Sequence, residues 1–364
     1  MFYLLVDKYR FHFFAQEVGL RNAAVLLGLS LFLAACGGEQ TPCVPKSCAE
    51  LAIECGDALD NCQKPIRCPA CPQDKQCQNN RCVVVSDPSQ PLYAASGVYS
   101  TTIQPTGEAA DVYYPAPPDL ATGNYRFPWA LLVQGAYVDK QYYADFASRV
   151  ARYGIVVVVP NTANLFPGEN IIEIAAAHMS SENGAGSPIA GKLDLDTMFL
   201  LGHSQGGLCS VVALSDKCSM WTGCTCTQPF SLPAACKGGV FYGTFVLGAV
   251  PNNHRPIALV QGSVDGKCKP SQSLSTYQGI ADPPKAYVTV NGANHYGICN
   301  QNNPPGAQRD NTALTIDQGV AVETIARWSA LFLRGAILGE AGAYDYVFRT
   351  GDNLDPNVTV QLAP

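Results

Sequence analysis

The chain has 364 residues, of which 47% are hydrophobic and 14% charged, and this composition excludes a disordered or coiled-coil protein. The net charge of −6 leaves no excess of Lys and Arg, so we expect no nucleic-acid partner. The 16 cysteines exclude an ordinary cytosolic enzyme, because cytosolic thiols stay reduced whereas exported proteins use disulfides. The length fits one large domain with a small module, or two medium domains.

A short apolar run occupies residues 23–35. Its 13 residues (35 − 22) are too few to cross a bilayer and are typical of the apolar region of a secretory signal. Small residues precede Cys36, and this ending resembles a bacterial lipoprotein signal. The resemblance implies cleavage before Cys36, lipid attachment to its thiol and, because Gly rather than Asp follows, the outer membrane. We expect a signal peptide at 1–35 and a lipidated tether at 36–42; a buried core helix is the alternative.

Half of the cysteines lie between residues 43 and 82, in a segment with little apolar material. Such a segment cannot fold on hydrophobic burial alone, and an even cysteine count in an exported chain indicates disulfides of unknown pairing. Structural zinc is the alternative, although no second Cys pair or His follows the Cys-Pro-Ala-Cys stretch. We predict a disulfide-rich module at 43–82 and a linker at 83–91. The cysteines of the module are Cys43, Cys48, Cys55, Cys62, Cys68, Cys71, Cys77 and Cys82.

Residues 92–364 alternate short apolar runs with amphipathic stretches. Short, wholly apolar runs suit parallel strands that are buried on both faces. Helical spacing is present at 142–153 and at 318–338. This alternation predicts an α/β domain with a mostly parallel central sheet flanked by helices. The predicted strands cover 112–114, 130–133, 155–159, 198–201, 257–260 and 287–290.

The strongest motif is the stretch 202–207, Gly-His-Ser-Gln-Gly-Gly, between a predicted buried strand and a helical stretch. This context is typical of a nucleophile elbow, in which Ser204 sits on a sharp strand-to-helix turn so that its hydroxyl projects. The flanking glycines leave room for close approach of backbone segments. We predict Ser204 as the nucleophile and expect His203 to point away and pack. A Gly-rich turn is the alternative.

A serine nucleophile needs a base and an acid that follow it in the chain. His295 lies just after the predicted strand 287–290, at the carboxyl end where catalytic groups of parallel sheets gather, so we predict it as the base. His254 precedes a strand and is expected in a loop at the opposite end. Asp265 follows the strand 257–260 and is the predicted acid, with Asp282 as its competitor.

The oxyanion hole of such a site uses two backbone N–H groups. One belongs to the residue after the nucleophile, which is Gln205. The other belongs to the turn after the strand 130–133. We predict the N–H of Ala136, with Tyr137 as the second choice.

Seven further cysteines lie in the large domain. If Asp265 and His295 are adjacent, their loops bring Cys268 and Cys299 within bridging distance, so we predict a disulfide between them. Cys209 is then left over as a buried free thiol. The remaining four are expected to pair among themselves and staple an insertion at 216–236; they are Cys218, Cys224, Cys226 and Cys236.

The large domain resembles the α/β-hydrolase branch that holds cutinase-like polyester hydrolases, chlorophyllases and platelet-activating-factor acetylhydrolases. The resemblance implies an α/β-hydrolase fold and carboxylic-ester hydrolysis through an acyl-enzyme, without metal or cofactor. It assigns nucleophile, acid and base to Ser204, Asp265 and His295. The stretches that carry it are 112–115, 152–157, 187–194, 202–207 and 291–295.

Three departures from the polyester hydrolases limit what the resemblance implies about substrate. Those enzymes carry an aromatic residue after the oxyanion-loop Gly, where this chain has Ala136 and then Tyr137. They have Met after the nucleophile, where this chain has Gln205, and Trp on the next strand, where Phe245 is expected. Tyr137 and Phe245 are the expected substrate contacts, and the expected substrate is a carboxylic ester of the cutinase, polyesterase or lipase kind.

Two other functions stay open from the sequence. One is a non-catalytic surface lipoprotein that binds through its Cys-rich module and keeps a hydrolase scaffold; the other is an esterase of the phospholipase or acetylhydrolase type. In each case we expect a monomer in the cell envelope, held at the membrane by a lipid anchor.

Overall fold

The computed structural model describes residues 43–69, 75–78, 80–84, 87–162, 170–215, 230–248, 250 and 254–364. The chain divides into two compact units, one of Met1–Ala70 with Asn79–Arg81 and one of Cys71–Gln78 with Cys82–Pro364. The expected signal peptide, the lipidation site Cys36 and most of the predicted insertion lie outside the described residues. Among the described residues, none of the helices combines the length and the apolar character needed to cross a membrane.

The first unit is built on an antiparallel hairpin of β1 (Gly56–Leu59) and β2 (Pro65–Cys68). Disulfides join Cys43 to Cys62 and Cys48 to Cys68, which confirms part of the disulfide reading of this segment. Cys55 and Cys82 are also disulfide-bonded. The side chains of Cys71 and Cys77 lie outside the described residues. Strands β3 (Lys75–Gln78) and β4 (Arg81–Val84), which belong to the second unit except for Arg81, form a separate two-stranded ribbon.

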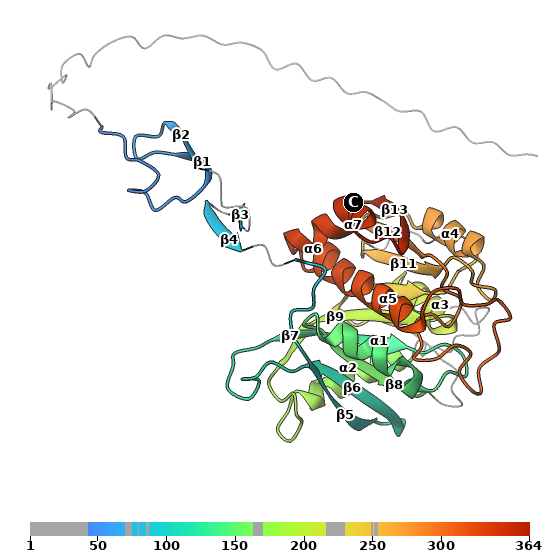
Figure 1. Cartoon of the computed structure of the whole chain (residues 1–364). Coiled ribbons are helices and arrows are strands. Elements are labelled where there is room, and N and C mark those ends of the chain that lie inside the picture. The colour runs from blue at the N-terminus through green and yellow to red at the C-terminus, as the bar shows by residue number, and fades with distance from the viewer. Residues whose placement is uncertain are drawn as a thin grey trace, which may run out of the picture. The chain divides into compact units, whose positions relative to one another are not determined.

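The second unit contains a nine-stranded sheet of order β13-β12-β11-β10-β9-β7-β8-β6-β5 (Figure 1). Six neighbouring strands, from β8 to β12, are parallel, and the strands at both ends pair antiparallel. The sheet is therefore mostly parallel, as the sequence predicts. Its strands are β5 (Ser96–Ile103), β6 (Glu108–Pro115), β7 (Phe127–Val133), β8 (Val156–Pro160), β9 (Leu193–His203), β10 (Cys236–Tyr242), β11 (Ile257–Gly262), β12 (Lys285–Val290) and β13 (Val358–Ala363).

Helices cover both faces of this sheet and create two apolar clusters. Successive residues of β9 alternate between them: Phe199 belongs to one cluster and Leu200 to the other, as expected for a strand buried on both faces. One face packs against α1 (Ala144–Ala151) and α5 (Gln318–Phe332). The other packs against α2 (Asn170–Glu182), α3 (Gln205–Leu214) and α4 (Pro270–Gly279).

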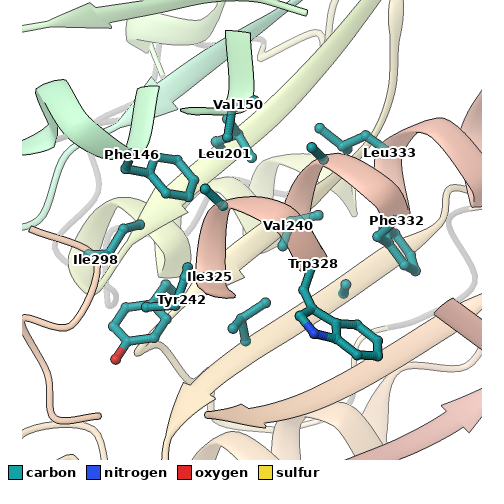
Figure 2. Packing of buried hydrophobic residues seen from close by; sticks show 14 of the residues in the cluster. Phe146, Val150, Leu201, Val240, Tyr242, Ile298, Ile325, Trp328, Phe332 and Leu333 are labelled. Carbon is teal, nitrogen blue, oxygen red and sulfur yellow. The ribbon is translucent and has the colours of Figure 1, made fainter. Parts of the chain in front are cut away.

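The cluster beneath α1 and α5 is rich in large side chains (Figure 2). Residues from these two helices meet residues of the central strands there, among them Phe146, Val150, Leu201, Val240, Ile325, Trp328 and Phe332. The predicted C-terminal helix continues past α5 as a π-helical turn, Leu333–Ile337. The shorter elements are a 3-10 turn Lys140–Tyr143, α6 (Ala341–Asp345), a π-helical turn Tyr346–Thr350 and α7 (Gly351–Leu354).

Candidate active site

Ser204 occupies a sharp turn between β9 and α3. Its backbone has φ 53° and ψ −120°, a left-handed conformation that a non-glycine residue rarely adopts. The turn also needs the neighbouring glycines: a Cβ on Gly202 would lie 2.7 Å from the Gly207 Cα, and one on Gly206 would lie 2.2 Å from the Val133 oxygen. The local backbone thus has the strand–turn–helix shape that the motif predicts, with the serine at its apex.

The structure brings Ser204, His295 and Asp265 together from three separate loops. The Ser204 Oγ lies 2.9 Å from His295 Nε2, and His295 Nδ1 lies 2.9 Å from Asp265 Oδ2. These loops follow β9, β12 and β11, which are parallel neighbours within the sheet except for the intervening β10. His295 and Asp265 are each 3% exposed, so their contact is shielded from solvent.

Asp265 is held by donors on both carboxylate oxygens. Oδ1 accepts the backbone N–H groups of Lys267 and Cys268, each at 2.8 Å. Oδ2 accepts from Gln261 Nε2 at 3.1 Å in addition to His295. The donors fix the plane of the carboxylate and point Oδ2 at the imidazole.

A second buried carboxylate, Asp310, ties the acid and base loops together. Its Oδ2 accepts the backbone N–H of Gly266 and that of His295, each at 3.1 Å, and Oδ1 accepts the N–H of Thr312. Sequence reasoning missed this residue, because it lies in a polar loop with no motif around it. The only sequence signal is its charge in a segment between β12 and α5.

His254 and Asp282, the alternatives to the predicted base and acid, lie close to each other, ahead of the amino ends of β11 and β12. The backbone N–H of His254 donates to Asp282 at 2.7 Å, and His254 is exposed. His254 precedes β11, so it lies at the amino end of that strand, whereas Asp265 follows its carboxyl end. The expectation from strand-end placement is therefore confirmed for this pair.

The loop of residues 134–138, after β7, holds the predicted oxyanion donor Ala136. The N–H of Val138 donates to the Gly135 oxygen at 3.1 Å, which closes a turn with Ala136 and Tyr137 at its centre. Tyr137 has φ 62° and is 49% exposed. Gln205 is the first residue of α3, so its N–H lies in the first helical turn, where the helix dipole favours negative charge.

Phe245 does not lie on a strand, contrary to the sequence-based expectation. β10 ends at Tyr242, and Phe245 lies half-buried in the loop that follows. The chain turns off the strand at Gly243, whose φ is 57°. A Cβ at Gly243 would lie 3.1 Å from Asp265 Oδ2, so this loop starts directly against the acid.

The predicted disulfide between Cys268 and Cys299 is wrong, since both residues are thiols. Cys299 is wholly buried in the apolar cluster under α1 and α5. Cys268 is instead turned toward Ser204 and Asp265, and burial, reinforced by the Asp265 charge, raises the pKa of its thiol to about 12. The two loops are adjacent as expected, but the thiols face different surroundings.

The expectation of a free thiol at Cys209 is also wrong, because Cys209 is disulfide-bonded. The prediction of a single Cys209 follows from counting seven cysteines with Cys268–Cys299 as one pair and four insertion cysteines as two more. Cys236, Cys268 and Cys299 are thiols instead, which leaves four of the seven (7 − 3), an even number that includes Cys209. The expected disulfide pairing of Cys236 within the insertion is wrong as well, because Cys236 is a thiol, buried at the start of β10. Cys218, Cys224 and Cys226 lie outside the described residues.

Neither a search for metal-binding side chains nor comparison with known proteins assigns a further function to the site. Within the described part of the chain, no group of three or more His, Cys, Asp or Glu is placed to hold a metal ion. No protein-family model matches the chain, and no curated protein matches it.

Proposed function

We propose that this protein is a serine hydrolase of carboxylic esters, with an α/β-hydrolase fold. One observation carries the proposal: Ser204 is held at φ 53° with its Oγ 2.9 Å from His295 Nε2, while Asp265 holds the other imidazole nitrogen. A strained residue persists only where surrounding structure enforces it, and such residues cluster at functional sites. A scaffold that only bound a partner would gain nothing from this arrangement.

The first half-reaction forms an acyl-enzyme. His295 Nε2 takes the proton of Ser204 as the Oγ attacks the ester carbonyl carbon, and Asp265 stabilises the imidazolium. The backbone N–H groups of Gln205 and Ala136 hold the oxyanion of the tetrahedral intermediate. When the intermediate collapses, the imidazolium gives its proton to the departing alkoxide and the alcohol leaves.

The second half-reaction repeats these steps with water. His295 takes a proton from the water molecule, whose oxygen attacks the acyl carbon bound to Ser204. Collapse of the second tetrahedral intermediate releases the carboxylic acid and returns the proton to Ser204. Apart from the ester and the water molecule, every group that acts in these steps belongs to the chain. Tyr137, exposed on the 134–138 loop, is the proposed contact for the acyl or alcohol part of the substrate.

Replacement of Ser204 tests the proposal. Ser204→Ala should lower kcat for p-nitrophenyl butyrate on the order of 10⁶-fold, because the nucleophile is lost. An organophosphonate should label the wild type at Ser204 and leave the variant unlabelled, as read by mass spectrometry of peptides. Circular dichroism and the melting temperature serve as the folding control. A variant that keeps more than about a tenth of the wild-type rate would contradict the assignment.

A further inference from the structure

A buried chain of hydrogen bonds links the 134–138 loop to His295 through Tyr143 and His203. The backbone N–H of Gly135 donates to the Tyr143 hydroxyl at 2.8 Å. That hydroxyl lies 2.9 Å from His203 Nδ1, and His203 Nε2 lies 2.9 Å from the backbone oxygen of His295. Tyr143 and His203 are both 0% exposed, so water does not compete for these bonds.

The donors and acceptors in this chain allow one arrangement of protons. The His295 carbonyl can only accept, so His203 Nε2 must carry its hydrogen. In a neutral imidazole the other nitrogen then accepts, and Nδ1 takes the hydroxyl hydrogen of Tyr143. The tyrosine oxygen has a lone pair left for the Gly135 N–H. Every group is used once, and each bond orients the next.

The surroundings keep His203 in this neutral form. Complete burial holds the pKa of His203 well below its ordinary value, and the nearby His295 lowers it further. The two imidazole rings lie 4.8 Å apart between centroids. A charged His203 would oppose the imidazolium that His295 becomes during the reaction, whereas the neutral ring does not.

The backbone at Gly135 also leaves room for this series of hydrogen bonds. A Cβ on Gly135 would lie 2.6 Å from His203 Nδ1, so only glycine lets the 134–138 loop come this close. The same loop is tied on its other side, where Gln134 Nε2 donates to the Val138 oxygen at 3.1 Å. The N–H of Ala136 therefore belongs to a loop whose position depends on Tyr143.

We infer that Tyr143 and His203 are positioning residues that hold the oxyanion loop, residues 134–138, in register with the base His295. The inference rests on the proposed function, because the oxyanion hole stabilises charge only if Ser204 attacks a carbonyl carbon. Neither side chain touches the substrate. Their effect falls on the transition state, in which the Ala136 N–H and the His295 ring must be correctly placed at the same time.

Tyr143→Phe tests this inference, with Tyr153→Phe as the matched control. Tyr153 is buried in the same apolar cluster and its hydroxyl donates to the Ser89 oxygen, away from the site. Tyr143→Phe leaves the Gly135 N–H without its acceptor. We expect kcat for p-nitrophenyl butyrate to fall about tenfold or more with KM nearly unchanged. Inhibition by phenylboronic acid, which forms a tetrahedral adduct, should weaken by a similar factor.

The control separates positioning from mere stability. Tyr153→Phe should lower the melting temperature about as much and keep the wild-type kcat. His203→Leu and the double variant with Tyr143→Phe extend the test: because both changes break one chain, their losses in kcat should not multiply. Equal kcat for Tyr143→Phe and Tyr153→Phe, or fully multiplicative losses, would overturn the inference. An inactive wild type, or an active Ser204→Ala, would instead overturn the proposed function.

Discussion

At the scale of single residues, Asp265 concentrates the polar chemistry of the site. All four of its partners are donors: the N–H groups of Lys267 and Cys268, the Gln261 amide and the His295 ring. A carboxylate can accept all four hydrogen bonds, whereas an amide must present its NH₂ group to one pair of donors. The carboxylate oxygen that faces the imidazole determines which nitrogen of His295 carries hydrogen.

Asp265→Asn should therefore leave the fold intact and lower kcat for p-nitrophenyl butyrate on the order of 10³ to 10⁴-fold, because the amide favours the wrong imidazole tautomer. Steady-state kinetics on the purified variant measure the loss. Asp282→Asn is the matched control, since Asp282 pairs with His254 on an exposed loop, and its kcat should equal that of the wild type. A loss for Asp282→Asn with none for Asp265→Asn would exchange the two assignments.

Cys268 is the second residue whose state can be checked directly. Burial and the Asp265 charge raise its pKa to about 12, so the thiolate is a minute fraction at neutral pH. Alkylation of Cys268 by iodoacetamide should be slow at pH 8 and rise about tenfold per pH unit for as long as the fold persists. Peptide mass spectrometry follows the reaction. A Cys268 peptide linked to a Cys299 peptide under non-reducing conditions would contradict the thiol state of these two residues.

At the scale of elements, apolar runs reveal most of the strands that are buried on both faces. Wholly apolar runs identify β7, β8, β9 and β11, because no polar residue interrupts them at 130–133, 155–159, 198–201 and 257–260. β5 alternates with Ser and Thr at the sheet edge, and β10 contains two glycines, so neither shows such a run. Helix α4 is missed for a similar reason, since its sequence Pro-Ser-Gln-Ser-Leu-Ser-Thr-Tyr-Gln-Gly has little apolar periodicity.

The site divides in the same way between what the pattern reveals and what it hides. Strand-end placement predicts where Ser204, Asp265 and His295 lie, because the sheet topology brings carboxyl ends together. It does not reveal which group connects the loops. The predicted disulfide was correct in placing the acid and base loops next to each other, but wrong about what connects them. Asp310, which is 44 residues from Gly266, connects them by accepting backbone N–H groups, and such groups carry no sequence signal.

Asp310 gives a prediction at this scale. Asp310→Ala leaves the N–H groups of Gly266, His295 and Thr312 without their acceptor, which should cost about 2–4 kcal/mol of unfolding free energy and lower kcat as the base loop shifts. Asp310→Asn keeps an amide oxygen for two of the three and should recover most of kcat. Urea unfolding and steady-state kinetics measure both effects.

The control for Asp310 is Asp317→Ala. Asp317 accepts the N–H of Val320 as the N-cap of α5, so its loss should cost about 1 kcal/mol without changing kcat. If Asp310→Ala and Asp317→Ala affect kcat equally, Asp310 has no part in holding the base loop.

At the scale of the whole molecule, the two units are stabilised by different means. The large unit has two extensive apolar clusters, whereas the described buried residues of the first unit are Cys55, Cys68 and Asp60. With so little apolar surface to bury, the hairpin of β1 and β2 depends on its covalent links. Every residue of the candidate site belongs to the large unit, and none belongs to that hairpin.

Removal of one bridge separates the two units experimentally. The double variant Cys48→Ser, Cys68→Ser opens a loop with a sequence separation of 20, and the chain-entropy estimate for such a bridge is about 3 kcal/mol. Hydrogen exchange of residues 56–68 should become fast, while kcat for p-nitrophenyl butyrate stays within about twofold of wild type. Retained protection of the hairpin would show that its packing suffices without the bridge.

The backbone conformation of Ser204 lowers the stability of the fold but is needed for activity. A φ of 53° suits glycine, and holding a serine there costs on the order of 1–3 kcal/mol that the rest of the fold must offset. Selection for stability alone would favour glycine at this position, so the serine marks a trade between thermal robustness and turnover. Engineering for heat resistance can improve the two apolar clusters freely, but it reaches a limit at this turn, where relief of the strain removes the reacting hydroxyl.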